Sequence, residues 1–134
     1  MNCLDSSFIV DFLDSDADHH EAAIEWIKAR SDGAHATPSL CAFEVLQGSA
    51  RAGDEQFDRA VGFLRTLTVL DLTLDAAIAA GELDGARHAA GEPLEPRDTL
   101  VASAARENAA TLVTRDKNFD RIPDLNVTPY DDPL

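Results

Sequence analysis

The chain has 134 residues, a length that fits one domain with a substantial core, and we expect residues 1–134 to form a single domain. Hydrophobic residues make up 45% of it, which is typical of a globular protein, and no apolar stretch approaches the ~20 residues that span a membrane. The net charge of −14 argues against non-specific nucleic-acid binding. With no signal peptide apparent at the N-terminus, we expect a cytoplasmic protein.

Apolar periodicity predicts strands that alternate with helices along the chain. Thr37 as N-cap and Pro38 at the first helical position are expected to open the third helix, and Ser6 or Ser7 to cap the first. In chain order the predicted elements are a strand at 2–5, helices at 8–13 and 19–29, a strand at 34–37, helices at 38–50 and 55–67, a strand at 68–72, helices ending at 88 and spanning 97–107, a strand at 111–114, a helical turn at 119–122, a strand at 126–128 and a tail at 129–134.

This alternation predicts an α/β fold: a three-layer α/β/α sandwich around a mostly parallel central sheet of about five strands. The surface of this fold would be strongly acidic, because Asp and Glu number 25 and only two lysines are present, Lys28 and Lys117. Self-repulsion of such a surface is screened in salt, so the composition favours a salt-adapted protein. An ordinary acidic protein is the alternative.

Two predicted strands end in a carboxylate. Asp5 follows the first strand, and Asp116 follows the strand at 111–114. Open α/β sheets bind ligands outside the carboxyl ends of their strands, so both side chains are expected at a ligand-binding edge. Each also has a simpler interpretation, because Asp5 could cap the first helix and Asp116 the helical turn that follows it.

Two further carboxylates occupy unusual helical positions. Glu44 lies on or beside a predicted buried stripe that includes Leu40 and Phe43, where an unpaired carboxylate is costly. Asp98 lies in the first turn of an Ala-rich helix and is expected to lean toward the core. The alternatives are a buried Arg partner for Glu44, and for Asp98 a capping role or interaction with the helix dipole.

All four carboxylates can converge at one end of a parallel sheet. Such a cluster repels itself unless a cation neutralises it, and the chain has few lysines to do so. A group of carboxylates without nearby sulfur or imidazole prefers a hard divalent cation. The sequence therefore predicts a site for Mg²⁺ or Mn²⁺.

Four segments in the same order resemble the PIN domain family, and most closely the toxin nucleases of VapBC toxin–antitoxin systems. The segments are residues 4–7 (LDSS), 43–46 (FEVL), 96–104 (PRDTLVASA) and 112–116 (LVTRD). The resemblance extends over essentially the whole chain. It implies a PIN-like fold and a metal-dependent ribonuclease.

The resemblance also implies roles for individual residues. Asp5, Asp98 and Asp116 would be direct or water-mediated ligands of one or two Mg²⁺ or Mn²⁺ ions, and Glu44 a ligand or a residue that positions the attacking water. The remaining expectations concern supporting residues: Ser6 and Thr114 as donors that orient carboxylates, Asp120 as a further acidic contact or a surface Asp, and Arg97 and Arg115 as phosphate contacts or as charge balance for the neighbouring acids.

The favoured function is thus a toxin endoribonuclease that cleaves structured RNA, such as tRNA or rRNA, and stops translation. The resemblance implies a homodimer and a cognate VapB-type antitoxin laid across the acidic groove. One alternative keeps the chemistry but makes the protein a housekeeping RNA-processing nuclease. The others are a non-catalytic binding module and a phosphoacceptor receiver-like module.

Overall fold

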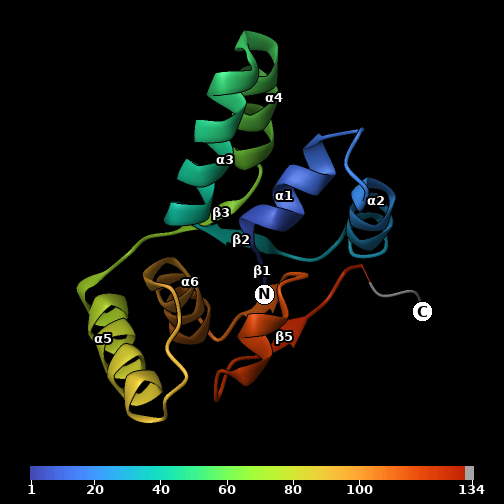
Figure 1. Cartoon of the computed structure of the whole chain (residues 1–134). Coiled ribbons are helices and arrows are strands. Elements are labelled where there is room, and N and C mark those ends of the chain that lie inside the picture. The colour runs from blue at the N-terminus through green and yellow to red at the C-terminus, as the bar shows by residue number, and fades with distance from the viewer. Residues whose placement is uncertain (132–134) are drawn as a thin grey trace.

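A computed structural model describes residues 1–131 of the chain (Figure 1). No helix in this part of the chain is long and apolar enough to cross a membrane. The elements in chain order are β1 (Asn2–Leu4), α1 (Ser6–Leu13), α2 (His20–Lys28), β2 (His35–Pro38), α3 (Ser39–Ala52), α4 (Asp54–Leu64), β3 (Thr68–Leu70), α5 (Leu74–Ala89), α6 (Pro96–Glu107), β4 (Thr111–Val113), the 3-10 helix η1 (Lys117–Arg121) and β5 (Val127–Thr128).

The strands form one parallel sheet in the order β3-β2-β1-β4-β5. The first strand is therefore central, with β2 on one side and β4 on the other, where Leu4 pairs with Val113. The predicted parallel sheet of about five strands is confirmed. In a receiver-like module the first strand lies beside the second and third strands, so the receiver alternative is wrong.

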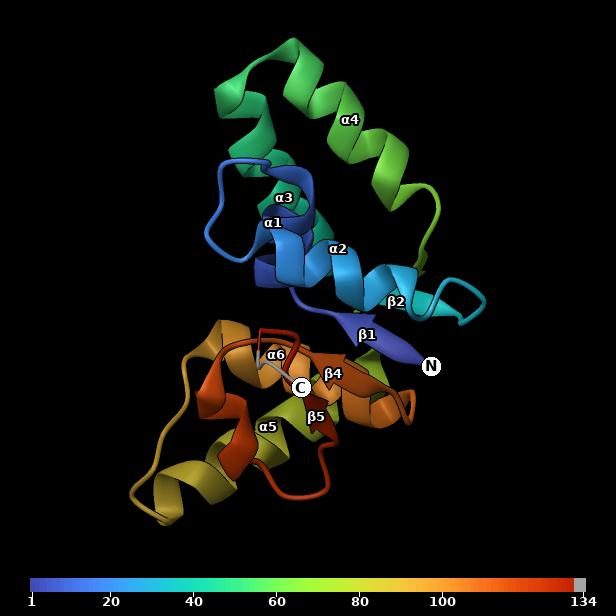
Figure 2. The same ribbon diagram turned by 90° about the vertical axis from the view of Figure 1, so that its right-hand side faces the viewer.

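Helices cover both faces of this sheet (Figure 2). Along β1 and β4 successive side chains point to opposite faces, as the pleat of a strand requires. Cys3 and Leu112 pack in the cluster formed with α5 and α6, whereas Leu4 and Val113 pack in the cluster formed with α1 to α4. These two cores are the two interfaces of the predicted three-layer sandwich, which is confirmed.

The helix starts differ from the prediction in two places. Asp5, and not Ser6 or Ser7, is the N-cap of α1, since its carboxylate accepts a hydrogen bond from the Ser6 backbone N–H. Pro38 ends β2 and occupies the N-cap position of α3. The predicted cap by Thr37 is wrong because its hydroxyl donates instead to the carbonyl oxygen of Leu4 on the neighbouring strand, 2.8 Å away.

The prediction that the chain is a tail from residue 129 onward is wrong for Tyr130. Tyr130 is only 5% exposed and packs in the core cluster beside Phe8 of α1, with ring centroids 4.8 Å apart. Its hydroxyl donates a hydrogen bond to Asp11. The segment after β5 thus closes over α1, while the rest of the predicted tail, 132–134, lies outside the described residues.

Candidate functional site

The sheet order has one reversal, between β1 and β4, and the crevice at such a reversal is where doubly wound sheets bind ligands. Asp5 is the first residue after β1, and Asp116 lies three residues beyond the end of β4. A cavity of about 460 Å³ opens at this position, lined by Asp5, Ser6, Ser7, Arg97, Arg115, Asp116 and Lys117. The two strand-end carboxylates therefore face a common space, as predicted.

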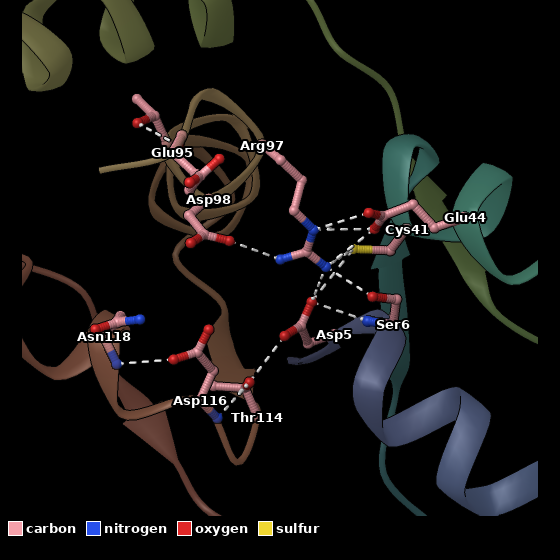
Figure 3. A network of polar contacts seen from close by, with 11 residues as sticks. Asp5, Ser6, Cys41, Glu44, Glu95, Arg97, Asp98, Thr114, Asp116 and Asn118 are labelled. Carbon is pink, nitrogen blue, oxygen red and sulfur yellow. Dashed lines mark hydrogen bonds and ion pairs between the residues drawn. The ribbon is translucent and has the colours of Figure 1, made fainter. Parts of the chain in front are cut away.

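Arg97, the second residue of α6, binds three of the four predicted carboxylates (Figure 3). Its Nη2 atom lies 2.7 Å from Oδ1 of Asp5, and its Nη1 atom lies 2.9 Å from Oδ1 of Asp98. Its Nε atom lies 2.9 and 3.1 Å from the two carboxylate oxygens of Glu44. Side chains from α3, from α6 and from the residue between β1 and α1 thus converge on one guanidinium group.

Asp5 is the most buried member of the cluster, with 2% of its surface exposed. Oδ1 accepts hydrogen bonds from the backbone N–H of Ser6 and from Arg97, and the thiol of Cys41 lies 3.6 Å away. Oδ2 accepts a hydrogen bond from the hydroxyl of Thr114 at 2.8 Å. These donors compensate the cost of burying a carboxylate, which would otherwise amount to several kcal/mol.

Asp116 faces the cluster without contacting Arg97. Its carboxylate accepts a hydrogen bond from the backbone N–H of Asn118 at 2.9 Å and so caps η1, as the simpler interpretation predicted. Its own backbone N–H donates to the hydroxyl oxygen of Thr114 at 3.1 Å. Thr114 therefore links Asp5 to Asp116 through its hydroxyl group (Figure 3).

One premise for singling out Glu44 is wrong, namely the burial of Phe43, but Glu44 does lie beside the buried stripe of α3 and in the cluster. Phe43 is 58% exposed, so it is not on the buried stripe of α3, which consists of Cys41 and Val45. Glu44 lies at the edge of that stripe with its side chain 31% exposed. Its partner is Arg97, the arginine that the pairing alternative required.

The charges of the cluster act on one another. Burial raises the pKa of Asp98, the hydrogen bond from Arg97 lowers it, and the charges of Asp116 and Asp5 raise it again, so that the net shift is upward. Burial acts to lower the pKa of Arg97, but hydrogen bonds with Glu44 and the nearby Asp5 carboxylate raise it overall. The guanidinium is therefore firmly cationic, and one positive charge serves several carboxylates.

The remaining predicted residues have more peripheral positions. The backbone N–H of Ser6 orients Asp5 as described, whereas its hydroxyl oxygen accepts a hydrogen bond from Arg97 at 2.7 Å. Arg115 binds Asp11, with 2.9 Å between Nε and Oδ2, and its half-exposed side chain lies at the rim of the cavity. Asp120 is exposed and borders a neighbouring pocket with Asp116, outside the group around Arg97.

Asp11 and Lys117 were not predicted from the sequence. Asp11 is 3% exposed, and its position three residues after Phe8 on the apolar side of α1 was a usable signal, because a buried carboxylate needs a partner. Lys117 lines the cavity. Two features of the sequence could have indicated this position: Lys117 is one of only two lysines, and it directly follows Asp116.

The donor set suits a hard divalent cation, since Asp5, Asp98, Asp116 and Glu44 present only carboxylate oxygens to the crevice. Within residues 1–131, however, no three His, Cys, Asp or Glu side chains are gathered closely enough to hold one ion. The guanidinium of Arg97 lies among the carboxylates instead. The residues thus fit Mg²⁺ or Mn²⁺ in their chemistry, whereas in their present placement they hold the guanidinium of Arg97.

Comparison with known structures shows that solved proteins share this fold. The chain matches VapBC2 from Rickettsia felis, solved with a DNA fragment from its promoter, with a TM-score of 0.79 and 25% identity over 96% of this chain and 97% of that one. It matches FitAcB from Neisseria gonorrhoeae with a TM-score of 0.82 and 17% identity, covering 97% of this chain and 98% of that one.

Sequence comparison agrees. The chain is 29% identical over 95 residues to the tRNA(fMet)-specific endonuclease VapC of Salmonella typhimurium, an alignment that covers 69% of this chain and 72% of that protein. The sequence profile of the PIN domain matches residues 3–125. Because this match includes all four segments that suggested the resemblance, and nearly the entire chain, the protein belongs to the PIN domain family.

Proposed function

We propose that this protein is a metal-dependent endoribonuclease toxin of the VapC type. The observation that carries the proposal is the convergence of acidic side chains from separate elements at the reversal point of a PIN-domain sheet. Three of them, Asp5, Glu44 and Asp98, surround a single guanidinium, and Asp116 is tied to Asp5 through Thr114.

In the proposed site Asp5, Asp98 and Asp116 hold Mg²⁺ or Mn²⁺, and Glu44 binds the ion or positions the attacking water. A divalent ion bound there would lower the pKa of a water molecule and stabilise the leaving oxygen of the phosphodiester. Thr114 keeps the Asp5 carboxylate in a fixed orientation through its 2.8 Å hydrogen bond.

The cationic rim of the cavity suits an RNA backbone. Arg115 and Lys117 line the cavity beside Asp116 and are both exposed, so they can reach phosphate oxygens. These contacts place a backbone without reading its sequence. The substrate we propose is structured cytoplasmic RNA, with tRNA preferred because the name of the VapC relative from Salmonella typhimurium specifies tRNA(fMet), and rRNA as the other candidate. Cleavage of either would stop translation.

We propose a VapB-type antitoxin as the partner. A groove between α1, α3 and α4 is bordered by Val10, Leu13 and Val45 and also by Glu44, so a peptide lying in it would reach the carboxylate cluster. The relative from Rickettsia felis was solved as VapBC2 bound to a DNA fragment from its promoter, which supports a VapB-type partner. We also propose a homodimer. The exposed apolar side chains of Phe43 and Leu72 lie at a separate apolar pocket bordered by α3, β3 and α6, and a second copy of the chain could cover them.

Cleavage of total RNA by the purified protein tests the nuclease. The reactions would contain Mn²⁺ or chelator in high salt, with Asp98→Asn as the inactive variant and Asp58→Asn, an exposed position on α4, as the matched control. We expect discrete fragments that require metal, disappear with Asp98→Asn and persist with Asp58→Asn. Mapping the fragment ends would separate tRNA from rRNA. Absence of cleavage by protein freed of any bound peptide would refute the proposal in favour of a binding role.

A further inference from the structure

The guanidinium of Arg97 occupies the position among the carboxylates that a bound metal cation would need. Nε, Nη1 and Nη2 all donate hydrogen bonds, and the acceptors are three carboxylates and the hydroxyl of Ser6. Asp5 Oδ1 already receives three donors, which are Arg97, the backbone N–H of Ser6 and, at 3.6 Å, the thiol of Cys41. A divalent ion needs these same oxygen atoms, so the ion and the guanidinium compete for them.

The surroundings of Arg97 allow it to withdraw. Its side chain is 29% exposed and borders the cavity of about 460 Å³ that Ser7 and Lys117 also line. It extends from the first turn of α6, where Pro96 is the first helical residue, so only its own rotatable bonds need to change. Asp5 and Asp98, by contrast, are 2% and 8% exposed and have little room to follow it.

We infer that the guanidinium of Arg97 is an exchangeable internal counter-ion, which occupies the carboxylate cluster in the metal-free protein and must leave Asp5 and Asp98 before a divalent cation binds. This inference rests on the proposed metal site and describes how access to that site is regulated by the chain itself. The metal-free protein is thereby stabilised, because its buried carboxylates keep a partner. The cost is a weaker apparent affinity for metal.

The size of this effect follows from the population of the open arrangement. If the carboxylates are free of Arg97 in about a tenth of the molecules or fewer, the apparent Kd for the ion is raised roughly tenfold or more. Removing the guanidinium should remove this factor. It should also remove the stabilisation of the metal-free state, so the two effects have opposite signs and are measured separately.

Titration with Mn²⁺ alone, by calorimetry and by electron paramagnetic resonance of the free ion, tests the inference in the full chain. We expect Arg97→Gln to bind Mn²⁺ about tenfold more tightly than the unmodified protein. The control is Arg106→Gln, which removes the same charge from the same helix about 14 Å further along. In chelator we expect Arg97→Gln to melt at a lower temperature than the control, and to show the larger upward shift when Mn²⁺ is added.

A second variant, which keeps the positive charge, tests the inference even if Arg97→Gln fails to fold. Arg97→Lys retains one positive charge but lacks the planar fork that spans three carboxylates, so we expect its Mn²⁺ affinity to lie between those of the other two proteins. Equal Mn²⁺ affinities of the unmodified protein, Arg97→Lys and Arg97→Gln would refute the counter-ion inference and leave the nuclease proposal unaffected. Absence of Mn²⁺ binding in all of them would overturn both.

A measurement on the unmodified protein needs no substitution. Arginine Nε and Nη resonances in ¹⁵N NMR should show Arg97 protected from exchange in chelator, because every nitrogen of its guanidinium is hydrogen bonded. Saturation with diamagnetic Mg²⁺ should shift its Nη signals and speed their exchange with water. Unchanged Nη signals in a protein whose melting temperature has risen with Mg²⁺ would show that the ion binds with Arg97 in place, and would refute the inference.

Discussion

The hydroxyl of Tyr130 lies 2.6 Å from Oδ2 of Asp11, a contact that joins the first helix to the segment after the last strand. The same carboxylate oxygen accepts a hydrogen bond from Nε of Arg115 at 2.9 Å. Asp11 is 3% exposed, so these two donors compensate a buried negative charge. Because Arg115 directly precedes Asp116, this network also fixes the chain beside the candidate site.

Tyr130→Phe should destabilise the fold by about 1–3 kcal/mol, because Asp11 loses a donor that water cannot replace in the core. The free energy of unfolding in urea measures this change. A double-mutant cycle with Asp11→Asn isolates the pair, and we expect a coupling energy of about 0.5–3 kcal/mol. Strictly additive effects of the two substitutions would show that the hydrogen bond contributes nothing.

Alkaline pH should unfold the protein through the same residue. Burial and then the hydrogen bond to Asp11 raise the pKa of Tyr130 above its ordinary value near 10. Above pH ~10 the unfolded chain releases the phenolic proton while the folded chain keeps it, so stability falls as the pH rises through that value. Tyr130 is the only tyrosine, so the phenolate absorbance reports this group alone.

In that titration the phenolate signal of the native protein should appear only together with the loss of far-UV circular dichroism. The Tyr130→Phe protein should lack the added slope of stability against pH above ~10. A phenolate signal near pH 10 with an intact fold would contradict the burial of this hydroxyl.

The fold was largely predictable because its signals are local. Five short apolar runs separated by helical periodicity sufficed for a parallel sheet, since parallel strands need helical crossovers. The predictions that failed concern residues whose tertiary contacts replace the role that the local sequence pattern favours. Thr37 suits an N-cap, but its hydroxyl bonds the neighbouring strand, and Tyr130 follows a proline in an acidic segment, yet its ring finds Phe8 in the core.

The candidate site was predictable in composition and less so in arrangement. Asp5 and Asp116 were placed by topology alone, because carboxyl ends of adjacent parallel strands share an edge. The partnership of Arg97 with three acids depends on side-chain reach between residues up to 92 positions apart, which no periodicity encodes. Asp11 was missed although its position three residues after Phe8 places a carboxylate on the buried side of α1, where it needs a partner.

Thr114→Val should uncouple the two strand-end carboxylates. Valine nearly matches threonine in shape but lacks the hydroxyl that donates to Asp5 and accepts from the backbone of Asp116. We expect a loss of about 1–3 kcal/mol in unfolding free energy, because buried polar groups lose their partners. Mn²⁺ binding should also weaken. Thr111→Val at the other end of β4 is the matched control, and equal losses in both variants would contradict an orienting role for Thr114.

Salt should stabilise the protein, since its net charge of −14 makes the folded state repel itself. The Debye length falls from about 10 Å at 0.1 M to about 3 Å at 1 M salt. The melting temperature in KCl should therefore rise mainly below 1 M and then level off. A rise that continued linearly above 1 M would indicate a general salting-out effect, and no rise would contradict salt adaptation.

Asp98→Asn should abolish metal-dependent cleavage without weakening the fold. The net upward shift in the pKa of Asp98 means that the folded state holds the neutral carboxyl group better than the unfolded chain does. The ionised form therefore costs stability as the pH rises above the ordinary value near 4, and this cost is fully present above the folded pKa. The amide removes the cost, and it also removes one repulsive partner of Asp5 and Asp116.

In chelator at pH 7 to 8 we accordingly expect Asp98→Asn to melt at the same temperature as the unmodified protein or above it. Any advantage should shrink toward pH 5, and the rise in melting temperature on adding Mn²⁺ should be lost because a ligand is missing. Asp58→Asn should keep the Mn²⁺ response. A lower melting temperature of Asp98→Asn in chelator would show that its ion pair with Arg97, at 2.9 Å, outweighs the cost of burying the charge. A retained Mn²⁺ response would remove Asp98 from the metal site.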